Sequence, residues 1–296
     1  MNGIRALALA SGVAAVVTAT MLLSGCSTPG VPAASPGATG PMFEHIHELV
    51  ADQSDGSLLV ATHEGLYRLT IDASGSATTT GPLGGLDFDP MGFTIVDGTA
   101  YASGHPGPNT PDTFGSPNLG LITSTDVGET WTNVSLTGVT DFHGLAVMTS
   151  GGGLPLVFGY DASRQILERS LDGGATWSDG AELAARDILA VGRQLYATTA
   201  DGLAVSSDDG VTFTVDASAP ALYVLAADND GTISGVDTTG TLWTRAAGQE
   251  WVRGHTVTGA PQAFAIEGTR IYVADDRGIA LTDDAGATWT VLAVHK

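Results

Sequence analysis

An eight-residue pattern recurs along this chain and constrains its fold more than any other feature of the sequence. It reads Ser/Thr-x-Asp-x-Gly-x-Thr followed by an aromatic residue, and full copies lie at residues 124–131, 170–177, 206–213 and 282–289. A fifth copy, at residues 244–251, has lost the aspartate. We call this pattern the octad. Each copy predicts a hairpin turn, because the aspartate can accept hydrogen bonds from backbone amides, the glycine supplies a positive φ and the aromatic ring packs back on the hairpin.

The spacing of the octads predicts the architecture. Their aromatic residues, counting Trp251 of the eroded copy, are separated by 46, 36, 38 and 38 residues. A period near ~40 residues with four short strands per repeat is typical of the blades of a β-propeller. We therefore predict an all-β domain with six blades, with seven as the alternative because the first expected blade has no readable octad. The structural residues of the full octads are Asp126, Gly128, Trp131, Asp172, Gly174, Trp177, Asp208, Gly210, Phe213, Asp284, Gly286 and Trp289.

Residues 1–26 have the features of a bacterial lipoprotein signal peptide. Arg5 precedes a nearly unbroken apolar run from Ala6 to Leu23, and the segment ends at Cys26 in the letters LSGC, which match a lipobox. The run approaches the ~18 residues of a transmembrane helix, but the lipobox favours a leader that is cleaved before a lipid-modified Cys26. No other cysteine is present in the sequence, so we expect neither a disulfide nor a thiolate metal site.

Residues 27–41 contain only small residues, proline and glycine, and we expect them to form a flexible tether to a propeller domain at residues 42–296. The chain carries 11 basic and 32 acidic residues, and its net charge of −21 repels nucleic acid and anionic lipid. We therefore expect a monomeric extracytoplasmic protein that reaches the membrane only through its lipid anchor. A glycan, a protein or a metal ion is the expected ligand, and nucleic acid is excluded.

Most of the histidines are predicted to gather on one rim of the propeller. In a blade, the innermost strand starts at one rim and the second strand returns to it, whereas the octads lie on the opposite rim. Five of the seven histidines fall at such strand starts and returns, and one methionine aligns with two of them, while His255 and His295 fall outside the group. The candidate ligand residues are His45, His47, His63, Met91, His105 and His143.

This group of side chains predicts a transition-metal or other ligand site at the mouth of the central channel. Imidazole and thioether ligands favour copper, whereas zinc prefers histidine together with a carboxylate. Nearby carboxylates that could take part are Glu44, Glu64, Asp89 and Asp141. The alternative is a polar cap of histidines that are hydrogen-bonded to backbone carbonyl groups.

The octad resembles the Asp-box, or BNR repeat, of sialidases, sortilin-type receptors, some glycoside hydrolases and photosystem II assembly factors. That repeat specifies a hairpin and is shared by proteins of many activities. The segments around the histidines, at residues 44–49, 61–67, 91–94, 103–107 and 141–145, together resemble a family of secreted or lipidated bacterial proteins. Its members are described as glycosylhydrolases with BNR repeats, and the resemblance covers the mature domain. It implies a propeller and suggests glycoside hydrolysis, without identifying a catalytic residue.

Two kinds of glycoside hydrolase site can be sought in the sequence. A sialidase needs three arginines around a substrate carboxylate and a tyrosine nucleophile, but the Arg-Ile-Pro motif that opens sialidase domains is absent. The candidates for such a site are Arg164, Arg186, Arg277, Tyr160 and Tyr223. A pair of carboxylates is the other possibility, and the candidates are Asp89, Asp141, Asp187, Asp237 and Asp275.

Three functions therefore remain open from the sequence. The first is a binding protein with a metal or ligand site of copper or zinc type at the channel mouth. The second is an extracytoplasmic glycoside hydrolase, and the third is a scaffold that holds a protein partner. An insertion at residues 107–117 is either a lid over the mouth or an ordinary surface loop.

Overall fold

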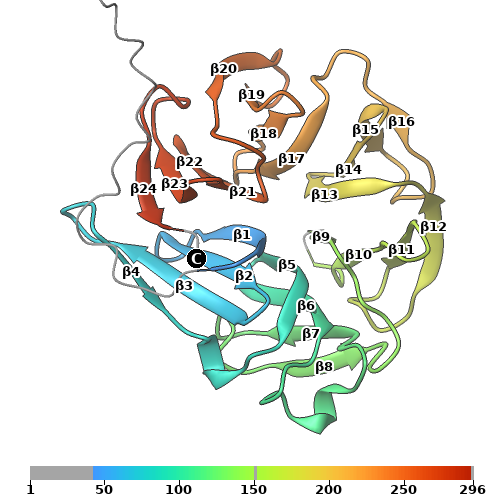
Figure 1. Cartoon of the computed structure of the whole chain (residues 1–296). Coiled ribbons are helices and arrows are strands. Elements are labelled where there is room, and N and C mark those ends of the chain that lie inside the picture. The colour runs from blue at the N-terminus through green and yellow to red at the C-terminus, as the bar shows by residue number, and fades with distance from the viewer. Residues whose placement is uncertain (1–42, 150–151, 295–296) are drawn as a thin grey trace, which may run out of the picture. The chain divides into compact units, whose positions relative to one another are not determined.

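The computed structural model describes residues 43–149 and 152–294. They form six sheets, each of four antiparallel strands that follow one another in the chain. The sheets are arranged in a ring, with β1, β5, β9, β13, β17 and β21 innermost (Figure 1). The chain is thus a six-bladed β-propeller, as the spacing of the octads predicts, and the seven-bladed alternative is wrong.

The strand bounds follow the blades in order. Blade 1 contains β1 (Ile46–Asp52), β2 (Ser57–Thr62), β3 (Gly65–Ile71) and β4 (Ala77–Thr80), and blade 2 contains β5 (Asp89–Val96), β6 (Thr99–His105), β7 (Leu121–Ser124) and β8 (Thr132–Ser135). Blade 3 contains β9 (Leu145–Met148), β10 (Leu156–Asp161), β11 (Ile166–Ser170) and β12 (Ser178–Glu182), and blade 4 contains β13 (Ala185–Val191), β14 (Gln194–Thr199), β15 (Gly202–Ser206) and β16 (Thr214–Val215). Blade 5 contains β17 (Leu222–Ala227), β18 (Ile233–Asp237), β19 (Thr241–Arg245) and β20 (Val252–Thr256), and blade 6 contains β21 (Ala263–Glu267), β22 (Arg270–Asp275), β23 (Gly278–Thr282) and β24 (Thr290–Ala293). The short 3-10 helices are η1 (Leu83–Gly85) and η2 (Asp112–Phe114).

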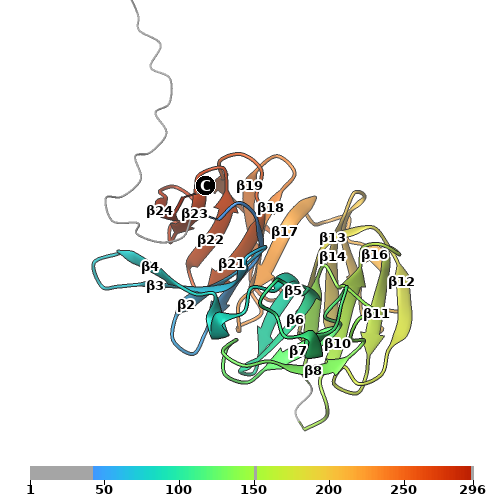
Figure 2. The ribbon, with the colours of Figure 1, turned by 60° about the horizontal axis from the view of Figure 1, so that its bottom comes forward.

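The ring closes between blade 6 and blade 1 by side-chain packing. Strand β1 lies against β21, and Figures 1 and 2 both show the first and last blades side by side. Phe43, Ile46 and Leu49 join Tyr272 and Ile279 in one buried apolar cluster. Each of the six described sheets is built from four consecutive strands.

Each full octad forms the hairpin between the third and fourth strands of its blade, as predicted. In blade 3, Asp172 accepts hydrogen bonds from the amide of Thr176 at 2.9 Å and from its hydroxyl at 2.6 Å. The hydroxyl of Ser170 accepts a hydrogen bond from the amide of Gly174 at 2.8 Å, and Trp177 donates to the carbonyl of Gly174 at 3.0 Å. The aspartates of the other full octads accept the equivalent bonds.

Antiparallel strands give the ring two distinct rims. We call the rim where the inner strands begin and the second strands end the mouth rim, and the opposite one the octad rim, because the octads lie there. Within the described ranges, no helix is both long and apolar enough to cross a bilayer. The expected signal peptide, Cys26 and the tether lie outside the described residues.

Two adjacent glycines in the blade 3 octad test how tightly the blades fit. Gly173 and Gly174 both have positive φ, at 76° and 91°, but only Gly174 faces the preceding blade. A Cβ on Gly174 would overlap the buried side chain of Leu121, whereas one on Gly173 would meet nothing closer than Pro155 at 3.8 Å. We expect Gly173→Ala to cost about 1 kcal/mol from backbone strain.

Gly174→Ala should cost about 2–4 kcal/mol, because steric overlap adds to the same strain. Urea unfolding of the two variants measures the difference. Equal losses of stability would contradict tight packing of the octad against the neighbouring blade.

Candidate functional site

At the mouth rim, a β-bulge inserts one extra residue at the start of each inner strand, relative to the second strand of the same blade. The pairing shifts register between Ile46 and Glu48 in β1, and β5, β13 and β17 have equivalent shifts. In blade 3, Tyr160 bonds to both His143 and Gly144 at 2.9 Å, and in blade 6 a similar two-to-one pairing occurs at Ala274. The extra residues, from blade 1 to blade 6, are His47, Met91, His143, Arg186, Tyr223 and Gln262. Such bulges redirect side chains, and they confirm the predicted equivalence of Met91 with the two histidines.

The first cluster at the mouth rim combines three histidines from blade 1 with an aspartate from blade 2. The Nδ1 atom of His63 lies 2.8 Å from Oδ2 of Asp89 and 3.2 Å from Nε2 of His47. The same Nε2 lies 2.9 Å from Oδ1 of Asp89. This last contact is not aligned as a hydrogen bond, and the buried Oδ1 accepts none from the described residues.

His45 completes the first cluster. One ring nitrogen from each of His45, His47 and His63 lies within 4.8 Å of the others, and the ring of His45 stacks on that of His63 with centroids 5.4 Å apart. Burial and the charges of the neighbouring imidazoles lower the pKa of His45. The side chain of His47 is only 6% exposed, whereas that of His63 is 50% exposed, so the cluster opens to solvent on one side.

A second cluster contains the other two predicted histidines. Nε2 of His143 and Nε2 of His105 lie 2.9 Å and 3.0 Å from the same atom, Oδ2 of Asp141. The hydrogen bond to Asp141 raises the pKa of His143. Nδ1 of His105 donates to the carbonyl oxygen of Pro117 at 3.2 Å, so the end of the 107–117 insertion holds the ring of His105.

The two clusters adjoin in blade 2. Asp89, at the start of β5, is paired directly with His105, at the end of β6. Five of the histidines therefore lie on one rim over three consecutive blades, as predicted, although they are divided between two aspartates. Met91 has the predicted backbone position, but its sulfur makes no hydrogen bond among the described residues. His255 lies on the outer strand β20, away from the clusters, and His295 lies outside the described residues.

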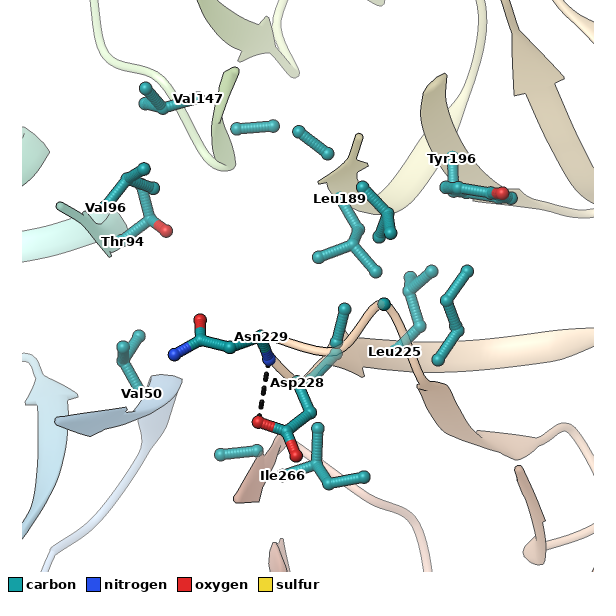
Figure 3. A pocket seen from close by; sticks show the side chains of 18 of the residues that line it. Val50, Thr94, Val96, Val147, Leu189, Tyr196, Leu225, Asp228, Asn229 and Ile266 are labelled. Carbon is teal, nitrogen blue, oxygen red and sulfur yellow. Dashed lines mark hydrogen bonds between the residues drawn. The ribbon is translucent and has the colours of Figure 1, made fainter. Parts of the chain in front are cut away.

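The central channel is a cavity of about 1140 Å³ that is lined by the inner strands of all six blades. Aliphatic side chains of the inner strands form part of its wall (Figure 3), and polar residues line it as well; the labelled aliphatic residues are Val50, Val96, Val147, Leu189, Leu225 and Ile266. Near the octad rim, Asn229 projects into the channel and its amide group donates to Gln53 at 2.9 Å. Asp228 holds this loop by accepting a hydrogen bond from the amide of Gly268 at 2.7 Å.

Two carboxylates line the channel toward the mouth rim, and the sequence does not show that they interact. Glu48 and Asp187 each follow the bulge residue of their inner strand, in blades 1 and 4. Burial raises the pKa of Asp187 to about 6. Burial, with the negative charge of Asp187, also raises the pKa of Glu48 well above its usual range. The nearby cation is Arg186, which donates to the carbonyl of Gln262 at 2.8 Å and stacks over Tyr223.

The other carboxylates considered for hydrolysis have local structural partners. Asp237 accepts hydrogen bonds within its own hairpin, including one from Trp243 at 2.7 Å. Asp275 is fully buried and forms an ion pair with Arg277. Both groups therefore stabilise turns between the second and third strands of their blades.

The three arginines considered for a sialidase site have different partners. Arg164 pairs with Asp179 at 2.8 Å, while Arg186 and Arg277 stack over aromatic rings. They do not share a partner that would mark a common substrate carboxylate. The candidate site is consequently the pair of histidine clusters at the mouth rim.

Comparison with known proteins supports the fold but no particular family. No family model and no curated protein matches the chain, so the resemblance to BNR-repeat glycosylhydrolases stays a prediction. A structure of a nidogen/laminin complex aligns over 81% of this chain and 93% of the matched chain, with 16% identity and a TM-score of 0.59. A gluconolactonase from Xanthomonas campestris aligns over 81% of this chain and 86% of its own, with 8% identity and a TM-score of 0.55.

PorZ, a surface component of the type IX secretion system of Porphyromonas gingivalis, also aligns. The match covers 84% of this chain and 32% of PorZ, with 14% identity and a TM-score of 0.54. At such low identities these structures show a shared fold alone.

The raised pKa values of the channel carboxylates make stability depend on pH. A carboxyl group whose pKa is higher in the folded state stabilises the fold below its usual pKa of about 4. For Asp187 this contribution is lost as the pH rises through about 6. We expect Asp187→Asn, which keeps an acceptor for the amide of Leu225, to increase the unfolding free energy by about 1–3 kcal/mol at about pH 7.5.

The gain should shrink toward pH 4, and chemical unfolding at a series of pH values measures it. The exposed Asp201 gives the control Asp201→Asn, for which we expect no change. A gain that is independent of pH would contradict a buried, titrating Asp187.

Proposed function

We propose that this propeller is a metal-binding protein and that His45, His47, His63 and Asp89 hold a divalent transition-metal ion of the zinc type. The convergence of three ligand atoms carries the proposal: Nε2 of His47, Nδ1 of His63 and the carboxylate of Asp89 lie 2.8–3.2 Å from one another. Ligand atoms bound tetrahedrally to Zn²⁺ at about 2.0–2.1 Å are about 3.3 Å apart. Only a small outward movement of the side chains would therefore make room for the ion.

One of the three contacts also supports a metal ion. The contacts of His63 with His47 and with Asp89 are aligned as hydrogen bonds, whereas the short contact between His47 and Asp89 is not. Ligands of an ion point toward a common centre and not toward one another, and this last contact fits that geometry. A bound cation would in addition satisfy Oδ1 of Asp89, which is otherwise a buried acceptor without a donor.

The donor set favours zinc over copper, for which a thioether ligand is expected. A carboxylate oxygen joins the imidazoles, whereas the sulfur of Met91 has no polar contact in the described structure. The expected lipid anchor on Cys26 would keep this site outside the cell and close to the membrane. In that setting the protein would capture or deliver metal ions, and glycoside hydrolysis is not needed to explain the site.

Metal analysis of the purified protein tests the proposal. After incubation with Zn²⁺ and dialysis, we expect His47→Ala and Asp89→Asn each to lose one equivalent of zinc relative to the wild type. The affinity at this site should fall by at least about 100-fold, because a direct ligand is removed. Elemental analysis gives the stoichiometry, and titration calorimetry with Zn²⁺ and with Cu²⁺ gives the affinity.

The control is His255→Ala, which removes an exposed histidine from outer strand β20 and should retain all the zinc. Zinc contents of His47→Ala and Asp89→Asn equal to that of the wild type would overturn the proposal, provided that thermal unfolding shows both variants to be folded.

A further inference from the structure

We propose that His105, Asp141 and His143 form a second divalent-metal site beside the first. The second site extends the proposed function but does not depend on it, since the two sites share no ligand atom. Its donors come from the end of β6 and from the segment before β9, on blades 2 and 3.

The neighbours of His105 determine which of its ring nitrogens carries the proton and which carries the lone pair. Its Nδ1 faces the carbonyl oxygen of Pro117 at 3.2 Å, and because a carbonyl only accepts, Nδ1 must carry the hydrogen. Nε2 of the neutral ring is then an acceptor, yet it lies 3.0 Å from Oδ2 of Asp141, which is another acceptor. Two facing lone pairs at this distance repel, so either a second ring proton or a metal ion must bridge them.

A metal ion satisfies this geometry better than a second proton. The contact between His105 and Asp141 is short but is not aligned as a hydrogen bond, whereas the contact of His143 with the same oxygen is aligned. If protons alone held both rings, Oδ2 would accept twice while the buried Oδ1 accepted nothing from the described residues. An unsatisfied buried acceptor destabilises the folded state. An ion bound by the two Nε2 atoms and by the carboxylate removes this conflict.

The surrounding backbone fixes the donors in the way that metal ligands are usually fixed. Metal-binding histidines commonly donate their other ring N–H to a carbonyl or carboxylate, and Pro117 supplies that carbonyl for His105. The amide of His143 donates to the carbonyl of Tyr160 at 2.9 Å, and the carbonyl of the next residue, Gly144, accepts from the amide of Tyr160 at 2.9 Å, so this segment is fixed by its backbone. The 107–117 insertion is itself held by Asp87, which accepts from the amide of Asn109 at 2.9 Å. The insertion would thus hold His105 in place as a metal ligand.

The site has three protein ligands and an open side. The side chains of His105 and His143 are 43% and 39% exposed, while Asp141 is 15% exposed. Zinc sites with three protein ligands keep a fourth position for water or another oxygen ligand. The second site would therefore present a metal-bound water or an exchangeable oxygen ligand to solvent.

Zinc stoichiometry of single and double variants tests the second site. The variants are His105→Ala, His143→Ala and Asp141→Asn for the second site, His47→Ala for the first, and the double variant His47→Ala with His105→Ala. Binding is measured in excess Mg²⁺, so that the acidic surface does not collect Zn²⁺ unspecifically. Circular dichroism and thermal unfolding verify that each variant is folded, and His143→Gln replaces His143→Ala if the latter is not.

We expect two equivalents for the wild type and for His255→Ala, one for each single-site variant, and none for the double variant. A wild type with one equivalent that is lost in His47→Ala but kept in His105→Ala would overturn the second site and leave the proposed function intact. One equivalent that is lost only in the second-site variants would support the second site and overturn the first. No binding by the wild type would overturn both.

Discussion

The contact between an octad glycine and a leucine of the preceding blade is the interaction on which the ring depends. Gly128, Gly174, Gly210 and Gly286 face Leu66, Leu121, Leu167 and Leu242, and a Cβ would overlap the leucine or come too close to it at each position. The eroded octad of blade 5 has lost this contact, because Gly248 has open space around it. There Arg245 lies over the rings of Trp251 and Tyr196 instead, and joins blade 5 to blade 4. The same hairpin that marks the repeat in the sequence thus spaces the blades.

The packing of the blades into a ring also determines which residues meet at the mouth rim. Each inner strand begins with a bulge, and the ring brings one bulge residue from every blade to the edge of the channel. The bulge residues are His47, Met91 and His143 on blades 1 to 3, and Arg186, Tyr223 and Gln262 on blades 4 to 6. The side of the mouth that carries the histidine clusters therefore faces a side where Arg186 is already held by Gln262 and Tyr223.

Much of this arrangement could be predicted from the sequence, because it follows from repetition. The octads and the alternation of strand direction place five histidines on one rim and make Met91 equivalent to His47. Contacts that depend on side-chain direction could not be predicted in this way. The division of the histidines between Asp89 and Asp141 is of this kind, and so is the approach of Glu48 to Asp187 across the channel. These two carboxylates lie in blades that are far apart in the chain, and the sequence shows only that each follows a bulge residue.

The junction between blades 6 and 1 is closed differently from the other junctions between blades. Many rings of this type are locked by a strand from one end of the chain that completes the blade at the other end, but here every blade is made from consecutive residues. Every other pair of neighbouring blades is joined by a peptide connection, whereas this pair is held by the apolar cluster around Phe43 and Tyr272 and by the hydrogen bond from the amide of Ile46 to Gln262. The seam is therefore closed without a covalent connection, and the buried apolar cluster that spans blades 1 and 6 takes the place of the peptide link that joins every other pair of blades.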